Sequence, residues 1–199
     1  MRFLTRIQIG KTQAARAKLS DSYAWHTALW AAFPGRDAEV RDFLFRVNDN
    51  LTHFQALLLS LEEPVPPPWG FWETTEIART FLDHKTYRFQ LKANPTMRRN
   101  NDRRRLGIYT EPRLREWILR KAGENGFGIV DGTLVVGAPI DQSFVRNGRR
   151  GKHTGVDFSG VLAVTDCDGF RHAFANGIGS AKAFGFGLLT LAPVSGVEG

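Results

Sequence analysis

The chain has 199 residues, 42% hydrophobic and 12% aromatic, which is enough to bury a core and excludes an intrinsically disordered chain. No apolar run reaches the roughly 18 residues of a membrane-spanning helix, and no secretory signal pattern follows the basic start. The single cysteine, Cys167, excludes an intrachain disulfide and a cysteine-rich zinc site. We therefore expect a cytoplasmic protein without membrane contact. The net charge of +7 and the pI of about 10.0 favour a polyanionic partner.

The first half of the chain predicts four strands and two helices. Three segments alternate apolar and polar residues with the period of a strand: 2–9, 41–48 and 86–92. Residues 51–61 are a further strand candidate, although their run Leu57-Leu58-Leu59 fits a strand or a helix. A helix is predicted over 22–33, capped by Asp21 or Ser22. A short helix from Thr74 to Phe81 is predicted before the fourth strand. The order strand, helix, strand, strand, helix, strand is that of a ferredoxin-like unit.

The second half repeats this order of elements without repeating the residues. Helices are predicted over 111–122 and 168–176, and strands near 127–137, 155–165 and 188–192. We therefore predict an α+β fold made of two tandem ferredoxin-like (βαββαβ) modules with antiparallel sheets. The predicted modules are residues 1–93, which carry the helix over 22–33, and residues 94–199, which carry two basic loops and a glycine-rich loop.

The predicted helix over 22–33 carries the first pattern with chemical meaning. Tyr23, His26 and Trp30 share a stripe beside the core-facing residues, so Tyr23 and His26 lie one turn apart. A histidine beside a tyrosine, off the core face, suits proton transfer near neutral pH. RNA brings its own nucleophile, the 2′-hydroxyl, so such a pair can assist cleavage. The structural alternative is a histidine packed at a helix edge with its hydrogen bonds satisfied.

A glycine-rich segment near the C-terminus is the second pattern. Its four glycines are Gly177, Gly179, Gly185 and Gly187. They allow the backbone to approach a ligand closely, and successive N–H groups can form an anion-binding concavity. Lys182 adds a positive charge, and Phe184 or Phe186 can stack on a base. The alternative is a plain turn between a helix and a strand.

Two arginine-rich segments form the third pattern, and both are predicted to be loops. The first supplies Arg98, Arg99, Arg103, Arg104 and Arg105, and the second supplies Arg149 and Arg150 beside Lys152 and His153. Arginines in this density suit phosphate contacts, although a solvated charged loop has the same composition. His153 is a second potential acid–base group. Neither the histidine spacing nor the carboxylates suggest a metal site, so we expect no metal and no cofactor.

Together these stretches resemble the CasE family of CRISPR-associated endoribonucleases. Residues 23–30 resemble the family's Tyr-x-x-His-x-x-Leu-Trp helix, and Phe33-Pro34 and residues 41–45 follow at similar spacing. Residues 89–95 resemble the end of its central strand, and residues 177–191 its C-terminal glycine-rich loop. The resemblance spans nearly the whole chain and is weakest over 96–150.

The resemblance implies metal-independent cleavage of precursor CRISPR RNA at the base of a repeat hairpin. The expected products are a 2′,3′-cyclic phosphate and a 5′-hydroxyl, after which the protein retains the hairpin as a subunit of the Cascade complex. By the same resemblance His26 transfers a proton, Tyr23 is its partner and Lys152 lies near the cleaved phosphate. The four glycines and Lys182 are expected to contact RNA.

Two other functions stay open at the level of sequence. One is a subunit on the same fold that binds the hairpin RNA without cleaving it. The other, which the lack of a metal-ligand pattern disfavours, is a metal-dependent or DNA-directed nuclease. A 2′-deoxy substitution at the scissile nucleotide should stop the metal-independent endoribonuclease, whereas cleavage by a DNA-directed nuclease stays possible.

Overall fold

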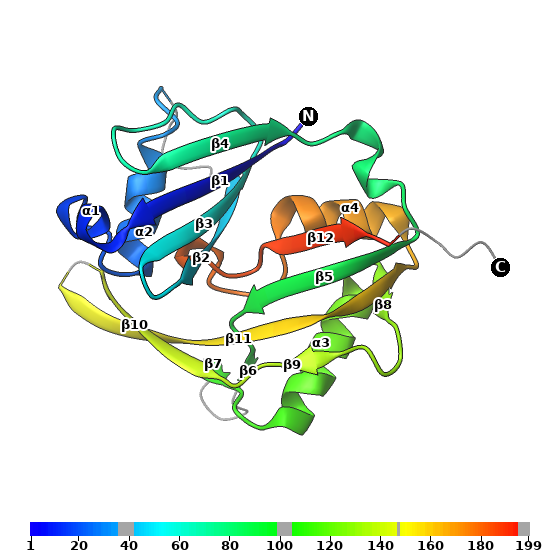
Figure 1. Cartoon of the computed structure of the whole chain (residues 1–199). Helices are drawn as coiled ribbons and strands as arrows, with labels where there is room; N and C mark the ends of the chain where they lie inside the picture. The colour runs from blue at the N-terminus through cyan, green and yellow to red at the C-terminus, as the bar shows by residue number, and fades with distance from the viewer. Residues whose placement is uncertain (36–41, 99–104, 147, 195–199) are drawn as a thin grey trace. The chain divides into compact units, whose positions relative to one another are not determined.

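The computed structural model describes residues 1–35, 42–98, 105–146 and 148–194. These residues form two antiparallel sheets with helices packed on them and a separate two-stranded hairpin (Figure 1). The α+β class expected from the sequence is confirmed. Within the same ranges, no helix is both long and apolar enough to cross a membrane.

The first sheet is built from the N-terminal strands. Its members are β1 (Phe3–Gly10), β2 (Phe43–Asp49), β3 (His53–Ser60) and β4 (Phe71–Glu76), in the antiparallel order β2-β3-β1-β4. Two helices, α1 (Lys11–Arg16) and α2 (Ser22–Trp30), follow β1. Trp25 and Leu29 of α2 are buried in one core with Ile7 and Phe45. Burial of each such side chain contributes about 1.5–3 kcal/mol, which holds α2 on the sheet.

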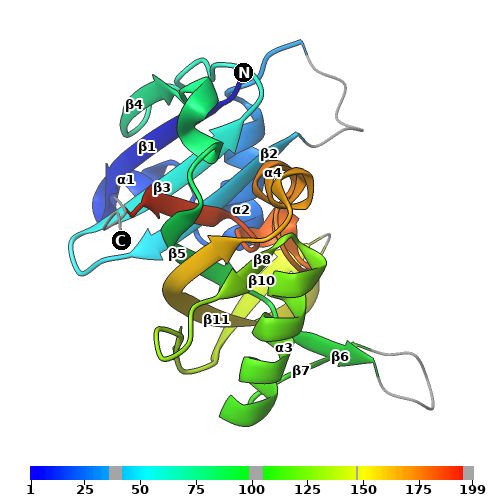
Figure 2. The same ribbon diagram turned by 90° about the vertical axis from the view of Figure 1, so that its right-hand side faces the viewer.

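The second sheet contains strands from the middle and the end of the chain. Its main members are β5 (Thr86–Ala93), β10 (Ile140–Arg146), β11 (Arg149–Val164) and β12 (Leu189–Pro193), in the order β10-β11-β5-β12. The short strands β8 (Phe127–Ile129) and β9 (Val135–Val136) also pair with β11. The helices α3 (Glu111–Glu124) and α4 (Cys167–Asn176) lie beside this sheet (Figure 2) and share its core through Trp117 and Phe170.

Three shorter elements complete the described chain. The strands β6 (Thr96–Arg98) and β7 (Arg105–Gly107) form the separate hairpin, which Figure 2 shows extending away from α3. Two 3₁₀ helices, η1 (Arg79–Leu82) and η2 (Lys182–Phe184), precede β5 and β12 respectively.

Both sheets have the strand order of a ferredoxin-like fold. In each, the first and third strands are central, the second strand flanks the third, and the fourth flanks the first. The second sheet has both crossover helices, α3 and α4. In the first, residues 61–70 with their proline run replace the second helix. The fold therefore consists of two tandem ferredoxin-like modules. They share the strand order but not the amino-acid sequence.

The predicted helix from Thr74 to Phe81 is wrong. Thr74 belongs to β4 and lies opposite Thr5 of β1, with the two Oγ1 atoms 3.0 Å apart. As a consequence β4 is the last strand of the first sheet. The segment 86–92, which was expected to fill that place, is β5 and pairs with β11 and β12 in the second sheet.

The chain divides into two compact units. The first contains Met1–Arg79, Ser143–Gly151 and Lys182–Gly185, and the second contains the other described residues. The division falls after Arg79, because β5 starts the second sheet, and not after residue 93 as expected. Two short segments from late in the sequence belong to the first unit, and both carry residues of the predicted site.

Candidate functional site

The helix α2 presents Tyr23 and His26 from the edge of the first core. Asp21 caps it, since its Oδ1 accepts hydrogen bonds from the N–H groups of Tyr23 and Ala24, both at 2.9 Å. Trp25 points into the core, whereas Tyr23 and His26 are half-buried. The predicted stripe beside the core-facing residues is confirmed.

The imidazole of His26 is held on several sides. Trp30 Nε1 donates a hydrogen bond to His26 Nε2 at 3.1 Å. The ring stacks on Phe45 at a centroid distance of 6.2 Å and 21°, and lies 5.7 Å from the Phe43 ring. Because Nε2 is the acceptor, the neutral ring carries its proton on Nδ1. The histidine therefore has a fixed orientation and a defined tautomer.

The glycine-rich segment reaches the same helix in the first unit. The 3₁₀ helix η2 contacts α2, and the Phe184 ring lies 6.4 Å from the Tyr23 ring. Gly185 has a φ of +83°, and a Cβ there would stand 3.2 Å from the Phe45 ring. This close approach explains the glycine and brings the half-buried Lys182 beside the Tyr23–His26 helix.

Burial divides the glycine-rich segment into two parts. Gly177, Gly185 and Gly187 are buried, and Gly179 packs against the Trp117 ring at 3.4 Å. The Gly187 N–H donates to the Lys92 carbonyl at 2.8 Å. These glycines serve the packing of the turn. The half-exposed part, from Gly179 to Lys182, is the surface at which a ligand contacts this segment most easily.

Lys152 lies on β11 in the second unit and forms an ion pair. Its Nζ is 2.8 Å from Asp141 Oδ2 on the neighbouring strand β10. Asp141 Oδ1 accepts a hydrogen bond from the Tyr109 hydroxyl at 3.0 Å, and the Thr154 hydroxyl lies 2.9 Å from both groups. The ammonium group lowers the pKa of Asp141, and the carboxylate raises the pKa of Lys152. Lys152 is therefore held charged and in place.

A buried asparagine connects β11 to the glycine-rich segment within the second unit. Asn94 Oδ1 accepts from the Thr154 N–H at 3.2 Å, and its Nδ2 donates to Ser180 Oγ at 3.3 Å. The same Nδ2 lies 3.4 Å from His153 Nδ1. Burial lowers the pKa of His153, which favours its neutral form. Asn94 thus fixes the strand that carries Lys152 against the loop that carries Ser180.

Comparison with known proteins identifies the family. A family model described as "CRISPR associated protein" matches residues 2–193. The CRISPR system Cascade subunit CasE of Escherichia coli (strain K12) is 32% identical over 200 residues, which cover 94% of this chain and 99% of that relative. The chain belongs to the CasE family.

Other members of the CasE family agree with this assignment. The CRISPR-associated endoribonuclease Cse3 of Thermus thermophilus is 28% identical over 211 residues, covering 96% of this chain and 100% of that relative. A solved structure of the Thermus thermophilus Cse3, bound to an RNA representing a pre-cleavage complex, superposes with a TM-score of 0.83 at 26% identity. That match covers 96% of this chain and 99% of the other.

Four of the arginines that were predicted to contact RNA in this CasE-family chain lie on strands. Arg98 and Arg105 lie opposite each other on β6 and β7, and both are exposed. Arg149 and Arg150 are exposed at the start of β11, so the loop predicted there is wrong. The first residues of β11 are polar and carry no apolar alternation, so the predicted strand near 155–165 began too late. The predicted residues Arg99, Arg103 and Arg104 lie outside the described ranges.

The structure groups the predicted residues by unit. Tyr23, His26 and Lys182 belong to the first unit, together with Arg149 and Arg150, whereas Lys152 belongs to the second. Sequence reasoning missed Asp141 and Tyr109, because their link to Lys152 depends on strand pairing. Asn94 was noticed only as part of the family-like stretch 89–95.

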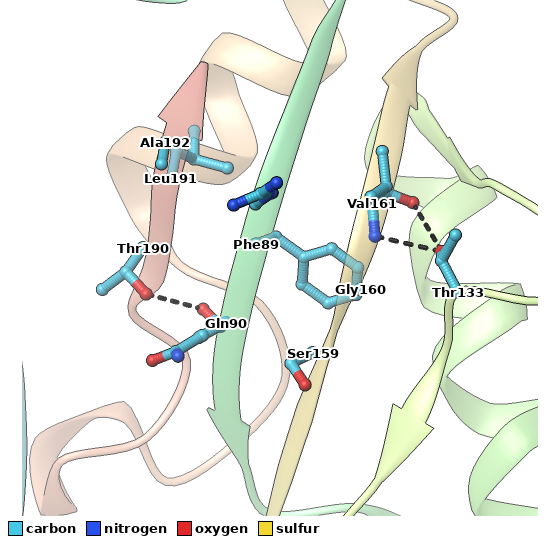
Figure 3. A pocket seen from close by; sticks show the side chains of 10 residues that line it. Phe89, Gln90, Thr133, Ser159, Gly160, Val161, Thr190, Leu191 and Ala192 are labelled. Carbon is cyan, nitrogen blue, oxygen red and sulfur yellow. Dashed lines mark hydrogen bonds between the residues drawn. The ribbon is translucent and has the colours of Figure 1, made fainter. Parts of the chain in front are cut away.

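A hollow of about 490 Å³ lies over the second sheet, and none of the predicted catalytic or RNA-binding residues lines it (Figure 3). The polar residues in its lining are Arg88, Gln90, Thr133, Ser159 and Thr190. Thr190 Oγ1 donates to the Gln90 carbonyl at 3.1 Å, and Thr133 Oγ1 accepts from the Val161 N–H at 3.0 Å (Figure 3). Both threonine hydroxyls therefore bond to the backbone of neighbouring strands.

Proposed function

We propose that this chain is an endoribonuclease that processes precursor CRISPR RNA. It cuts at the base of the repeat hairpin and then retains the hairpin. Membership of the CasE family supports this proposal, because one relative is named a CRISPR-associated endoribonuclease and another a Cascade subunit. The observation that carries it is the oriented His26, one helical turn from Tyr23 and beside the segment of Lys182.

The proposed reaction uses the 2′-hydroxyl of the RNA as nucleophile. A base removes its proton, the oxygen attacks the adjacent phosphorus, and the bond from phosphorus to the 5′-oxygen breaks. The leaving 5′-oxygen takes up a proton, which leaves a 2′,3′-cyclic phosphate and a 5′-hydroxyl. A positioned acid or base contributes ~10²–10⁴-fold to such a step.

His26 is the proposed proton-transfer residue, and Tyr23 is its partner that orients the 2′-hydroxyl or the scissile phosphate. Lys152 is proposed to stabilise the charge that develops on the phosphate, a role that its ion pair with Asp141 supports by keeping it protonated. No step of the proposed reaction requires a metal ion.

RNA binding is proposed for the exposed cations and the accessible part of the glycine-rich segment. Hairpin RNA has a deep, narrow major groove, so a protein contacts mainly its phosphates, its shape and its flanking single strand. The proposed contacts are Arg98, Arg99, Arg103, Arg104, Arg105, Arg149, Arg150 and Lys182, with the segment from Gly177 to Gly187 supplying backbone groups. Other Cascade subunits are proposed as protein partners, on the printed name of the Escherichia coli relative alone.

A second function, hairpin binding without cleavage, is supported by the surroundings of His26. Trp30, Phe43 and Phe45 enclose its ring much as they would enclose a structural histidine. Both functions share the same cations, so only a cleavage assay distinguishes them.

The test is incubation of the purified chain with a labelled repeat-hairpin RNA in EDTA. A matched RNA carries one 2′-deoxy nucleotide at the scissile position. We expect one cut in the unmodified RNA, ends that carry a cyclic phosphate, and no cut in the deoxy RNA. Tight binding with both RNAs intact would favour the second function. Cleavage that requires magnesium and survives the deoxy substitution would contradict the proposed chemistry.

A further inference from the structure

The carboxylate of Asp21 serves two structural elements at once. Its Oδ1 caps α2 through the N–H groups of Tyr23 and Ala24. Its Oδ2 accepts a hydrogen bond from the Val145 N–H of β10 at 3.1 Å. Since β10 is at the end of the strand order among the described strands, an N–H on its outer edge has no strand acceptor, and Asp21 supplies an acceptor to Val145.

The tip of the β10–β11 hairpin, Ser143–Gly151, belongs to the first unit through contacts beside this bond. The Phe144 ring lies 4.3 Å from Phe184, which in turn lies 6.4 Å from Tyr23. A Cβ on Gly151 would stand 2.2 Å from Phe144, so only glycine leaves room for that ring. The aromatic contacts hold the hairpin tip near α2. The hydrogen bond from Val145 to Asp21 is directional, so it fixes where the tip lies relative to the start of α2.

We propose that Asp21 is a positioning residue that sets the place of Arg149 and Arg150 relative to Tyr23 and His26. Both arginines are exposed on the hairpin tip, and Asp21 connects that tip to the first turn of the helix that carries Tyr23 and His26. The inference rests on the proposed function, since it assigns the arginines to RNA phosphates. Asp21 itself contacts no RNA in this account.

Asp21→Asn separates the two roles of the carboxylate. Asparagine is as good an N-cap as aspartate, so the cap of α2 is kept. Its amide then turns NH₂ toward the Val145 N–H, and two donors face each other. The substitution also removes one negative charge from a protein that binds a polyanion, so electrostatics alone would tighten RNA binding. A loss of positioning therefore predicts weaker RNA binding by Asp21→Asn, whereas electrostatics alone predicts tighter binding.

The experiment measures the Kd for the repeat hairpin at several salt concentrations, and the single-turnover cleavage rate, for wild type and Asp21→Asn. Glu63→Gln, which removes one charge from an exposed side chain, is the matched control. We expect Asp21→Asn to weaken binding roughly tenfold, the effect of losing one charge-assisted hydrogen bond between a displaced arginine and an RNA phosphate. The slope of log K against log salt should fall by about one to two, as expected when one or two phosphate contacts are lost.

A second variant approaches the same bond from the hairpin. Val145→Pro removes the N–H donor, and proline is accepted at outward-facing positions of edge strands. Val145→Pro should weaken RNA binding as much as Asp21→Asn does. The double variant should bind RNA little more weakly than either single variant. Binding by Asp21→Asn that equals or exceeds that of Glu63→Gln, with an unchanged salt slope, would overturn the inference. A wild-type chain that neither binds nor cleaves the RNA would instead overturn the proposed function.

Discussion

Gly185 offers a direct test of how the glycine-rich segment supports His26. It has a φ of +83°, and a Cβ would stand 3.2 Å from the fully buried Phe45 ring. Gly35 has the same φ of +83°, with nothing within 4 Å of a Cβ. Both glycines belong to the first unit. Substitution by alanine at the two sites therefore differs mainly in the contact with Phe45.

The expected cost of each substitution follows from these contacts. Left-handed backbone costs an L-residue roughly 1–2 kcal/mol, which applies to Gly35→Ala and to Gly185→Ala alike. Gly185→Ala adds overpacking against Phe45, typically about 1–3 kcal/mol, because Phe43 and His26 leave that ring little room to move. The free energy of unfolding should thus fall about 1–3 kcal/mol further in Gly185→Ala than in Gly35→Ala.

Urea denaturation of the two variants measures that difference, and single-turnover RNA cleavage measures its consequence. Because Phe45 stacks on His26, a displaced ring should slow cleavage roughly tenfold or more in Gly185→Ala, whereas Gly35→Ala should cleave at the wild-type rate. Equal losses of stability in the two variants, or full activity in Gly185→Ala, would refute this reasoning.

Two further predictions concern the groups that hold His26 and Lys152. Trp30→Phe removes the donor to His26 Nε2 but keeps an aromatic ring, so we expect slower single-turnover cleavage at an unchanged RNA Kd; an unchanged rate would show that the bond does not orient the imidazole. Asp141→Asn should destabilise the protein at neutral pH. Lys152 lowers the pKa of Asp141 below 3.8, so the stabilisation is present above that value and is lost as the pH falls through the lower folded-state pKa. Urea denaturation at pH 7 and at successively lower pH should show the difference between the two proteins shrinking below pH 3.8, and a constant difference would contradict the ion pair.

Elements with strong local patterns were predictable from the sequence. β1 alternates buried Thr5, Ile7 and Ile9 with exposed neighbours, and α3 buries Leu114, Trp117 and Ile118 at helical spacing. Asp21 was one of two caps considered for α2, and it is the cap that the structure has. In each case the information lies within one element.

Elements whose identity depends on distant partners were not predictable. Thr74, Thr75 and Glu76 look like a helix start, yet pairing with β1 makes them a strand. The start of β11 is polar and glycine-containing, and it becomes a strand by pairing with β10. The predicted α+β class was confirmed, whereas the predicted order of elements in the first half was wrong, because residues 71–76 form β4 and β5 belongs to the second sheet.

The candidate site shows the same limit. The stripe of Tyr23 and His26 follows from helical periodicity, but the contact between Tyr23 and Phe184 joins segments that only the folded chain brings together. The hydrogen bond between Asp21 and Val145 and the ion pair between Asp141 and Lys152 are equally invisible to local patterns. Sequence reasoning therefore found reactive groups better than the residues that orient them.

The central claim is that His26 transfers a proton during RNA cleavage. The most direct measurement compares wild type and His26→Ala with the same repeat-hairpin RNA in EDTA, under single-turnover conditions and with the Kd measured separately. We expect the cleavage rate of His26→Ala to fall by ~10²–10⁴-fold at an unchanged Kd. Cleavage by His26→Ala at the wild-type rate would contradict the account and leave His26 as a packed residue of the first core.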